Sequence, residues 1–124
     1  MIKGLGIDFV DVAEIQQNID SNGQYLERIF TASEIQYSKD SGDPYQRLAA
    51  RFAAKEATMK ALGTGWDQGV QWREIEVFND LSGRPMLRMY GHTAEISRRM
   101  GVRRVWVSLS HTPSHAIAEV VLED

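Results

Sequence analysis

The chain has 124 residues and no cysteine; 43% of its residues are hydrophobic, 25% are charged, and its net charge is −3. This composition is typical of a globular protein with one core. It excludes disulfides and thiolate metal sites, and it argues against a general nucleic-acid-binding protein. No apolar run reaches the roughly 18 residues of a membrane span and the start lacks a signal-peptide pattern, so we expect one cytoplasmic domain, residues 1–124.

The first segment predicts a strand that carries an acid. Residues 2–10 alternate between two faces, and Gly4 and Gly6 share a face with Asp8. The glycines leave open space there, which a helix or a ligand could occupy. Asp8 is therefore either an ordinary strand-end carboxylate or part of a site. The other face of the strand is apolar: Leu5, Ile7 and Phe9.

Two capping-box patterns then predict short helices. Asp11 and Glu14 indicate a helix over residues 12–20, and Thr31 with Glu34 indicates a second one that ends near residue 40. The outer face of the first helix carries no lysine or arginine.

Residues 47–65 predict the longest helix, because they are rich in strong helix formers and Gly63 can end a helix in the left-handed conformation. Glu56 falls inside the apolar arc of this helix and Lys60 near its edge. Two explanations are open. The two side chains form an i,i+4 ion pair, or Glu56 meets a cation, metal or donor from elsewhere in the chain. The opposite flank is basic: Arg51 and Lys55.

The rest of the sequence has mainly strand patterns. His111 lies in the turn between the last two predicted strands and is either a solvated turn residue or a functional group. The predicted elements are a hairpin of residues 72–78 and 85–90, a surface helix over 93–100, and strands over 104–110 and 116–122.

Two isolated carboxylates, a basic helix and a turn histidine together predict phosphoanhydride chemistry. Mg²⁺ takes one or two protein carboxylates, Asp8 and Glu56 here, and fills its other positions with water and substrate phosphates. Lysine, arginine and histidine side chains bind the remaining phosphate oxygens. A zinc site would usually need cysteine or further histidines beside these acids.

Four motifs in order along nearly the whole chain resemble the holo-[acyl-carrier-protein] synthases, the small bacterial 4′-phosphopantetheinyl transferases. The motifs are Gly4-Leu5-Gly6-Ile7-Asp8; Arg51-Phe52-Ala53-Ala54-Lys55-Glu56-Ala57 with Lys60-Ala61-Leu62-Gly63-Thr64-Gly65; Asn79-Asp80 with Gly83-Arg84-Pro85; and Ser108-Leu109-Ser110-His111-Thr112.

The resemblance implies an α+β fold, in which an antiparallel sheet packs against one long helix with several shorter helices. It implies a homotrimer that holds coenzyme A at its subunit interfaces. From the net charge and the lack of a long apolar run we expect no nucleic-acid or membrane partner. Such enzymes transfer the 4′-phosphopantetheine arm of coenzyme A to a serine of an apo acyl carrier protein and release adenosine 3′,5′-bisphosphate.

The resemblance also implies residue roles. Asp8 and Glu56 match the Mg²⁺ ligands, and Glu56 is the expected acceptor of the serine proton, directly or through water. Lys60 matches a lysine that neutralises the leaving phosphate, so the expected catalytic set is Asp8, Glu56 and Lys60. The positions that match coenzyme A contacts are Arg51, Lys55, Lys60, Gly83, Arg84, Pro85 and His111.

One departure concerns the carrier. The first helix of this family is usually basic, because it receives an acidic helix of the carrier protein, whereas this chain has Glu14 there. Two alternatives are therefore a divergent transferase for a specialised carrier of secondary metabolism and a non-catalytic coenzyme A-binding module. The presence of Asp8, Glu56 and Lys60 favours an enzyme.

Overall fold

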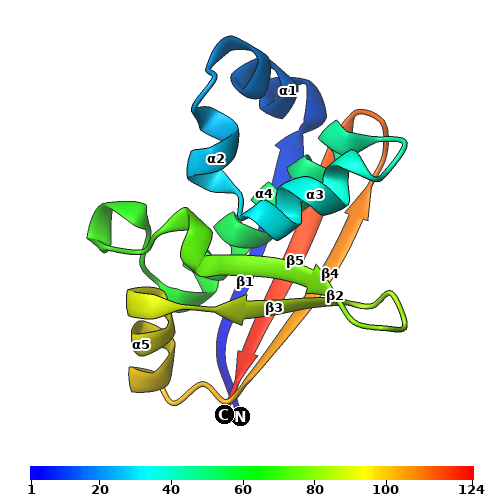
Figure 1. The fold of residues 1–124 in the computed structure, drawn as a ribbon. Coiled ribbons are helices and arrows are strands. Elements are labelled where there is room, and N and C mark those ends of the chain that lie inside the picture. The colour runs from blue at the N-terminus through cyan, green and yellow to red at the C-terminus, as the bar shows by residue number, and fades with distance from the viewer.

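In the computed structural model, which describes residues 1–124, a long helix packs across a three-stranded antiparallel sheet (Figure 1). The helix is α4 (Pro44–Leu62), and the sheet order is β1 (Ile2–Asp11), β5 (His115–Glu123), β4 (Arg104–His111). A separate hairpin consists of β2 (Ile75–Asn79) and β3 (Pro85–Met89). The α+β prediction is confirmed, with two antiparallel sheets in place of the one expected. The remaining helices are α1 (Val12–Ser21), α2 (Tyr25–Ile29), α3 (Ala32–Lys39) and α5 (Gly91–Arg99), with short 3₁₀ turns at Trp66–Gln68 and Trp72–Glu74.

Strand β1 lies directly against helix α4 because two glycines remove the side chains between them. A Cβ on Gly6 would lie 1.9 Å from the carbonyl oxygen of Ala57, and one on Gly4 would lie 2.1 Å from that of Ala61. The open face predicted for β1 is thus filled by a helix, whose small alanines permit the close approach. This contact places the middle of β1, with Asp8, beside the last two turns of α4.

Two helix ends follow the predicted signals, and one does not. Thr31 and Glu34 form the predicted capping box, in which the Thr31 N–H donates to Glu34 Oε1 at 2.9 Å. Helix α4 ends at Gly63, whose φ of 73° is left-handed. The capping box predicted for Asp11 is absent, since that carboxylate lies 3.5 Å from His115 Nε2 on the paired strand instead.

Helix α4 is buried on nearly every side, which corrects the prediction of one apolar arc with a basic flank. Arg51 is 2% exposed and Lys55 is 0% exposed, whereas Glu56 is only half-buried. The reason is that the hairpin and α3 cover the flank that the sheet leaves open. A helical pattern considered alone does not show this second cover.

Lys55 forms an ion pair inside the protein. Its Nζ lies 2.8 Å from Glu34 Oε1 and donates to the carbonyls of Trp72, at 3.0 Å, and Ile75. Glu34 Oε2 accepts the Val77 N–H at 2.9 Å, so the pair ties α3, α4 and β2 together. Burial lowers the pKa of Lys55, while the charge of Glu34 opposes that shift. With its ammonium enclosed and paired with Glu34, Lys55 supports the fold and has no exposed surface for the nucleotide contact predicted for it.

The face of the β1-β5-β4 sheet that points away from α4 is uncovered. Leu5, Ile7 and Phe9 on β1 are 61%, 55% and 64% exposed. Trp106 on β4 is also exposed. Leu5, Ile7 and Phe9 were predicted as the apolar face of β1. In one copy of the chain no helix covers this face, although the Phe9 ring stacks on the His115 ring of β5, with 4.9 Å between the ring centroids. Separately, none of the helices has both the length and the apolar content needed to cross a membrane.

Replacing Gly6 with alanine tests the close approach of β1 and α4. The added Cβ meets backbone that cannot move without separating strand and helix, so Gly6→Ala is expected to lower the free energy of unfolding by about 3 kcal/mol or more. Gly42→Ala is the matched control, because a Cβ there meets nothing within 4 Å. Urea unfolding of the three proteins measures the difference, and equal stability of both variants would contradict the packing described.

Removing the buried ammonium tests the assignment of Lys55. Lys55→Met leaves the Glu34 carboxylate buried without its cation and is expected to destabilise the protein by about 3–5 kcal/mol. Lys39→Met, at an exposed lysine of α3, is the control and should change stability little. A Lys55→Met protein of normal stability that no longer bound coenzyme A would instead support the ligand-binding role.

Candidate functional site

Asp8 and Lys60 meet where β1 crosses α4. The Lys60 ammonium donates to Asp8 Oδ1 and to the carbonyl of Ile7, both at 2.9 Å. Lys60 keeps 54% of its side chain exposed, while Asp8 is only 16% exposed. The i,i+4 ion pair considered for Glu56 and Lys60 is therefore not formed, because the lysine turns to the strand. This leaves the second explanation, in which Glu56 meets a cation, metal or donor from elsewhere in the chain.

Glu56 lies one turn before Lys60 and has neither a hydrogen bond nor an ion pair within 4 Å. Burial and then the nearby charge of Asp8 raise the pKa of Glu56 above its ordinary value, and Lys60 partly offsets them. Two carboxylates thus lie close enough to repel, with one lysine between them to compensate. Such a pair favours a further cation.

The donor set of this pair fits a hard divalent cation. Both groups are carboxylates, and no cluster of three or more histidine, aspartate or glutamate side chains is present that could hold a metal ion by itself. Mg²⁺ needs only one or two carboxylates from the protein, since water and substrate phosphates complete its shell. The residues present therefore fit Mg²⁺ better than they fit zinc.

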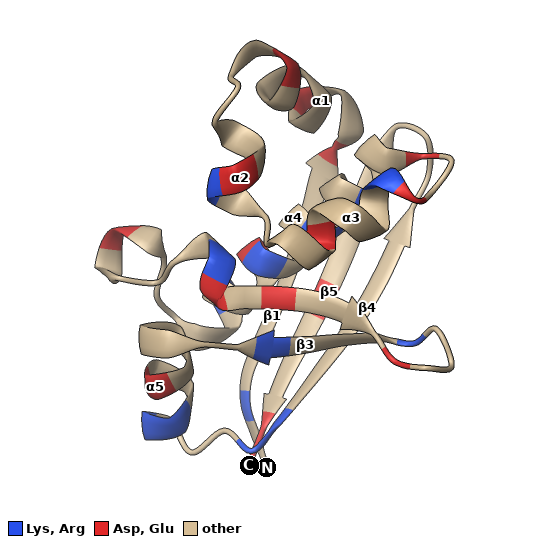
Figure 2. Cartoon of the chain, viewed as in Figure 1, with Lys and Arg blue, Asp and Glu red and all other residues tan.

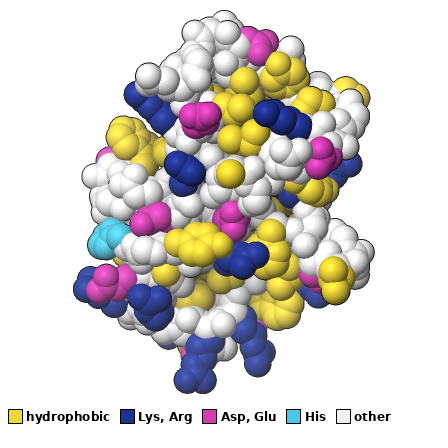
Figure 3. Space-filling model, viewed as in Figure 1, with side chains coloured by type: hydrophobic (Ala, Val, Ile, Leu, Met, Phe, Trp, Pro, Cys, Tyr) yellow, Lys and Arg dark blue, Asp and Glu magenta, His cyan; other side chains and the backbone are white.

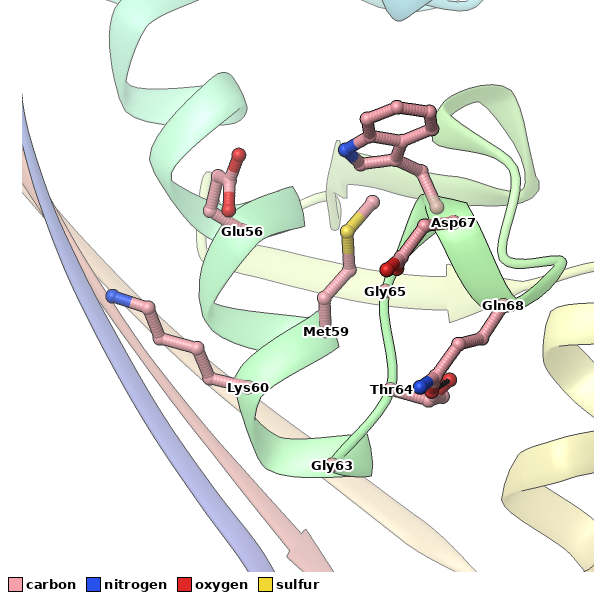
Figure 4. A pocket seen from close by; sticks show the side chains of 9 residues that line it. Glu56, Met59, Lys60, Gly63, Thr64, Gly65, Asp67 and Gln68 are labelled. Atoms are coloured by element: carbon pink, nitrogen blue, oxygen red, sulfur yellow. Dashed lines mark hydrogen bonds between the residues drawn. The ribbon is translucent and has the colours of Figure 1, made fainter.

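A pocket of about 390 Å³ opens beside Glu56 and Lys60 (Figure 4). Met59 lies between these two side chains and the turn that follows α4, from which Thr64, Asp67 and Gln68 enter the opposite wall. Two of the three predicted catalytic residues, Glu56 and Lys60, thus border a space large enough for part of a small-molecule substrate. Asp8 is not among the lining residues and is connected to the pocket through its bond to Lys60.

The second group of predicted residues lines a different pocket, of about 180 Å³. Arg51, Gly83, Pro85 and His111 meet there, although they come from α4, the β2–β3 hairpin and the end of β4. Arg51 Nη2 donates to Asn79 Oδ1 at 2.8 Å, and His111 Nδ1 lies 2.9 Å from Gln46 Oε1. A buried guanidinium and an imidazole on one pocket wall suit an anionic ligand.

Arg84 points away from this pocket, unlike its two neighbours in the sequence. Its guanidinium lies over the ring of Trp106 on β4, 5.3 Å from the ring centroid. The side chain therefore lies at the uncovered sheet face, and within one copy of the chain it does not join Arg51 and His111.

Several pocket residues were not predicted from the sequence. Arg47 lies one helical turn before Arg51, and this spacing could have indicated from the sequence that both arginines face the same pocket. Tyr37 has no such signal, because α3 brings it to α4 only in the folded chain. In the first pocket the side chains that reasoning from sequence missed are Met59, Trp66, Asp67 and Gln68.

Comparison with known proteins identifies the family of the chain. The family model described as the 4′-phosphopantetheinyl transferase superfamily matches residues 4–118. The holo-[acyl-carrier-protein] synthase of Koribacter versatilis is 46% identical over 125 residues that cover 100% of both chains.

Two solved structures are similar over nearly the whole chain. The holo-[acyl-carrier-protein] synthase of Neisseria meningitidis is 36% identical, has a TM-score of 0.87, and the match covers 100% of both chains. That of Bacillus anthracis, in complex with CoA (3′,5′-ADP), is also 36% identical, with a TM-score of 0.80 and coverage of 98% of this chain and 96% of the other. The chain therefore belongs to the holo-[acyl-carrier-protein] synthases of the 4′-phosphopantetheinyl transferase superfamily.

Proposed function

We propose that Asp8, Glu56 and Lys60 carry out the reaction of the family to which this enzyme belongs, the transfer of 4′-phosphopantetheine from coenzyme A to a serine of an apo acyl carrier protein. The observation that carries the assignment is the meeting of β1 and α4. It sets two close carboxylates and a half-exposed lysine beside one pocket. Adenosine 3′,5′-bisphosphate is the product that leaves.

Asp8 and Glu56 would hold Mg²⁺, which supplies positive charge at the transferring phosphate when bound. Glu56 is the proton acceptor for the serine hydroxyl, and the burial that raises its pKa makes it a better base than a solvated glutamate. The serine oxygen then bonds to phosphorus while the bond to the departing phosphate breaks. Lys60 neutralises the charge that grows on that leaving group.

The second pocket is the proposed site of the nucleotide of coenzyme A. Arg51 and His111 would meet its phosphates, and the backbone at Gly83 and Pro85 forms an adjacent wall that suits a base. We propose coenzyme A binding for the four predicted residues that line this pocket, which are Arg51, Gly83, Pro85 and His111. Arg84, over Trp106, would take part only if a neighbouring copy brings the ligand to that face.

A homotrimer would explain why residues proposed for one reaction line two separate pockets of the chain. Glu56 and Lys60 line one pocket of the chain, and Arg51 and His111 line another, so we propose that coenzyme A spans from one copy to the next. The uncovered apolar sheet face, with Leu5, Ile7 and Phe9, supports association, because an isolated chain leaves these side chains in water. The proposed unit in each copy is the single domain 1–124.

The choice of carrier follows from charge. Figure 3 shows lysine and arginine side chains both at the foot of the molecule and scattered over its middle and upper parts. Helix α1 has Glu14 in its first turn and no basic residue in its last turn. Figure 2 shows acidic residues on this helix but no lysine or arginine. Helix α1 would therefore not attract a strongly acidic carrier, and we propose a less acidic one, met in the cytoplasm.

Alanine at either carboxylate tests the metal pair. Asp8→Ala and Glu56→Ala are each expected to reduce transfer about a hundredfold or more, as loss of a metal ligand or of a general base does. Asp11→Ala, at the exposed acid that ends β1, is the matched control. Magnesium chloride should raise the melting temperature of the wild type and of the control but not of either variant. Near-normal transfer by Asp8→Ala or Glu56→Ala at saturating Mg²⁺ would contradict the shared site.

The separate roles of Lys60 and His111 predict different kinetic losses. Lys60→Ala should lower kcat with little change in coenzyme A affinity, because the charge on the leaving phosphate grows in the transition state. His111→Ala should mainly weaken binding. Titration calorimetry with coenzyme A, alongside turnover, separates the two effects. A Lys60→Ala protein with lower affinity and unchanged kcat would refute its assignment.

A further inference from the structure

Tyr37 lies in the proposed nucleotide pocket without any sequence motif to place it there. It projects from α3, and its ring lies against the guanidinium of Arg51, with 4.0 Å between the Arg51 Cζ and the ring centroid. The Cζ of Arg47, one turn earlier on α4, is 5.9 Å from the same centroid. An aromatic face at these distances attracts both cations and holds the nearer one in a stacked orientation.

Arg51 is nevertheless incompletely paired. It is 2% exposed, and its Nη2 donates to Asn79 Oδ1 at 2.8 Å, but its Nε has no hydrogen-bond partner at all. A buried N–H without a partner costs stability, so such groups are usually satisfied by water or a ligand. Because Arg51 lines the pocket, an anion there would complete the pairing of the guanidinium.

Two contacts fix the plane of this guanidinium. Asn79 anchors one edge and the Tyr37 ring covers one face, which leaves the arginine little freedom to swing out of the wall. A group preorganised in this way binds its ligand more tightly, because less side-chain freedom is lost on binding.

We infer that Tyr37 is a positioning residue for coenzyme A: its ring holds Arg51 in the orientation that meets the 3′-phosphate of the nucleotide. The inference rests on the proposed nucleotide site and adds to it the residue that orients its central cation. The 3′-phosphate is the phosphate of coenzyme A left for this pocket, because the pyrophosphate, whose P–O bond breaks in the transfer, belongs at the proposed carboxylate pair. Tyr37 acts through Arg51 and takes no part in the chemical step.

The test uses the full-length enzyme and two substrates, coenzyme A and dephospho-coenzyme A, which lacks the 3′-phosphate. Tyr37→Leu removes the ring and is expected to raise the KM for coenzyme A about tenfold with kcat unchanged, a loss of about 1.4 kcal/mol of binding. Tyr37→Phe keeps the ring face and should restore the wild-type KM. With dephospho-coenzyme A, the leucine variant and the wild type should have equal KM values.

Tyr90→Leu is the matched control. Tyr90 is exposed to a similar degree, 43% against 36% for Tyr37, but lies outside the pocket, so its loss should leave both KM values unchanged. Arg51→Lys provides a second background, since a lysine retains the charge without the planar stack. There, Tyr37→Leu should add no further increase in KM. Thermal melts identify any variant that is not folded. If Tyr37→Leu does not fold, the KM values of Tyr37→Phe and Tyr90→Leu still test the inference, because neither measurement uses that variant.

The possible results distinguish an error in the role of Tyr37 from an error in the proposed nucleotide site. An unchanged KM in Tyr37→Leu, a raised KM in Tyr37→Phe, or an equal loss with both substrates would overturn the role of Tyr37 while leaving the nucleotide site in place. If Arg51→Lys itself bound coenzyme A and dephospho-coenzyme A as the wild type does, the proposed nucleotide site would be wrong as well.

Discussion

The contact of β1 with α4 through Gly4 and Gly6 is the constraint on which the proposed catalytic site depends. With a side chain at either glycine, the strand would lie farther from the carbonyls of Ala57 and Ala61. Asp8, two residues beyond Gly6, would then move away from Lys60, with which it now shares a 2.9 Å bond. The same glycines that allow the packing of strand on helix therefore also set the spacing of the acid, the lysine and Glu56.

The proposed nucleotide pocket depends on a different interaction, the buried ion pair of Lys55 and Glu34. The pair joins α3 to α4 and β2, which are the elements that carry Tyr37, Arg51 and Asn79. A buried ion pair is not by itself a source of large net stability, but removing one partner leaves an uncompensated charge. Its value here is positional: it fixes the helix that brings Tyr37 to Arg51.

The sequence was sufficient for what is local and insufficient for what depends on packing. The Thr31 capping box, the helix end at Gly63 and the pairing of the hairpin strands are set by nearby residues and were predicted correctly. Two local predictions were wrong: residues 72–74 form a 3₁₀ turn and not part of the strand, and the capping box at Asp11 is absent. The grouping of Asp8 with Glu56 followed from two acids that interrupt apolar patterns. The burial of Lys55 was not predicted, because the pattern of a helix does not reveal a second layer over it. The bond from Lys60 to Asp8 and the place of Tyr37 likewise join segments whose contact only the fold decides.

The proposed division of the site between two copies of the chain is tested most directly by combining two variants, each expected to be inactive, in one oligomer. Asp8→Ala lacks the carboxylate pair, and Arg51→Met lacks the central cation of the nucleotide pocket. Oligomers assembled from equal amounts of both should recover about a quarter of the wild-type transfer activity, because that fraction of interfaces receives one intact half from each copy. Continued inactivity of the mixed oligomers, with each variant folded and associated, would show that a single copy supplies both halves and would contradict the shared site.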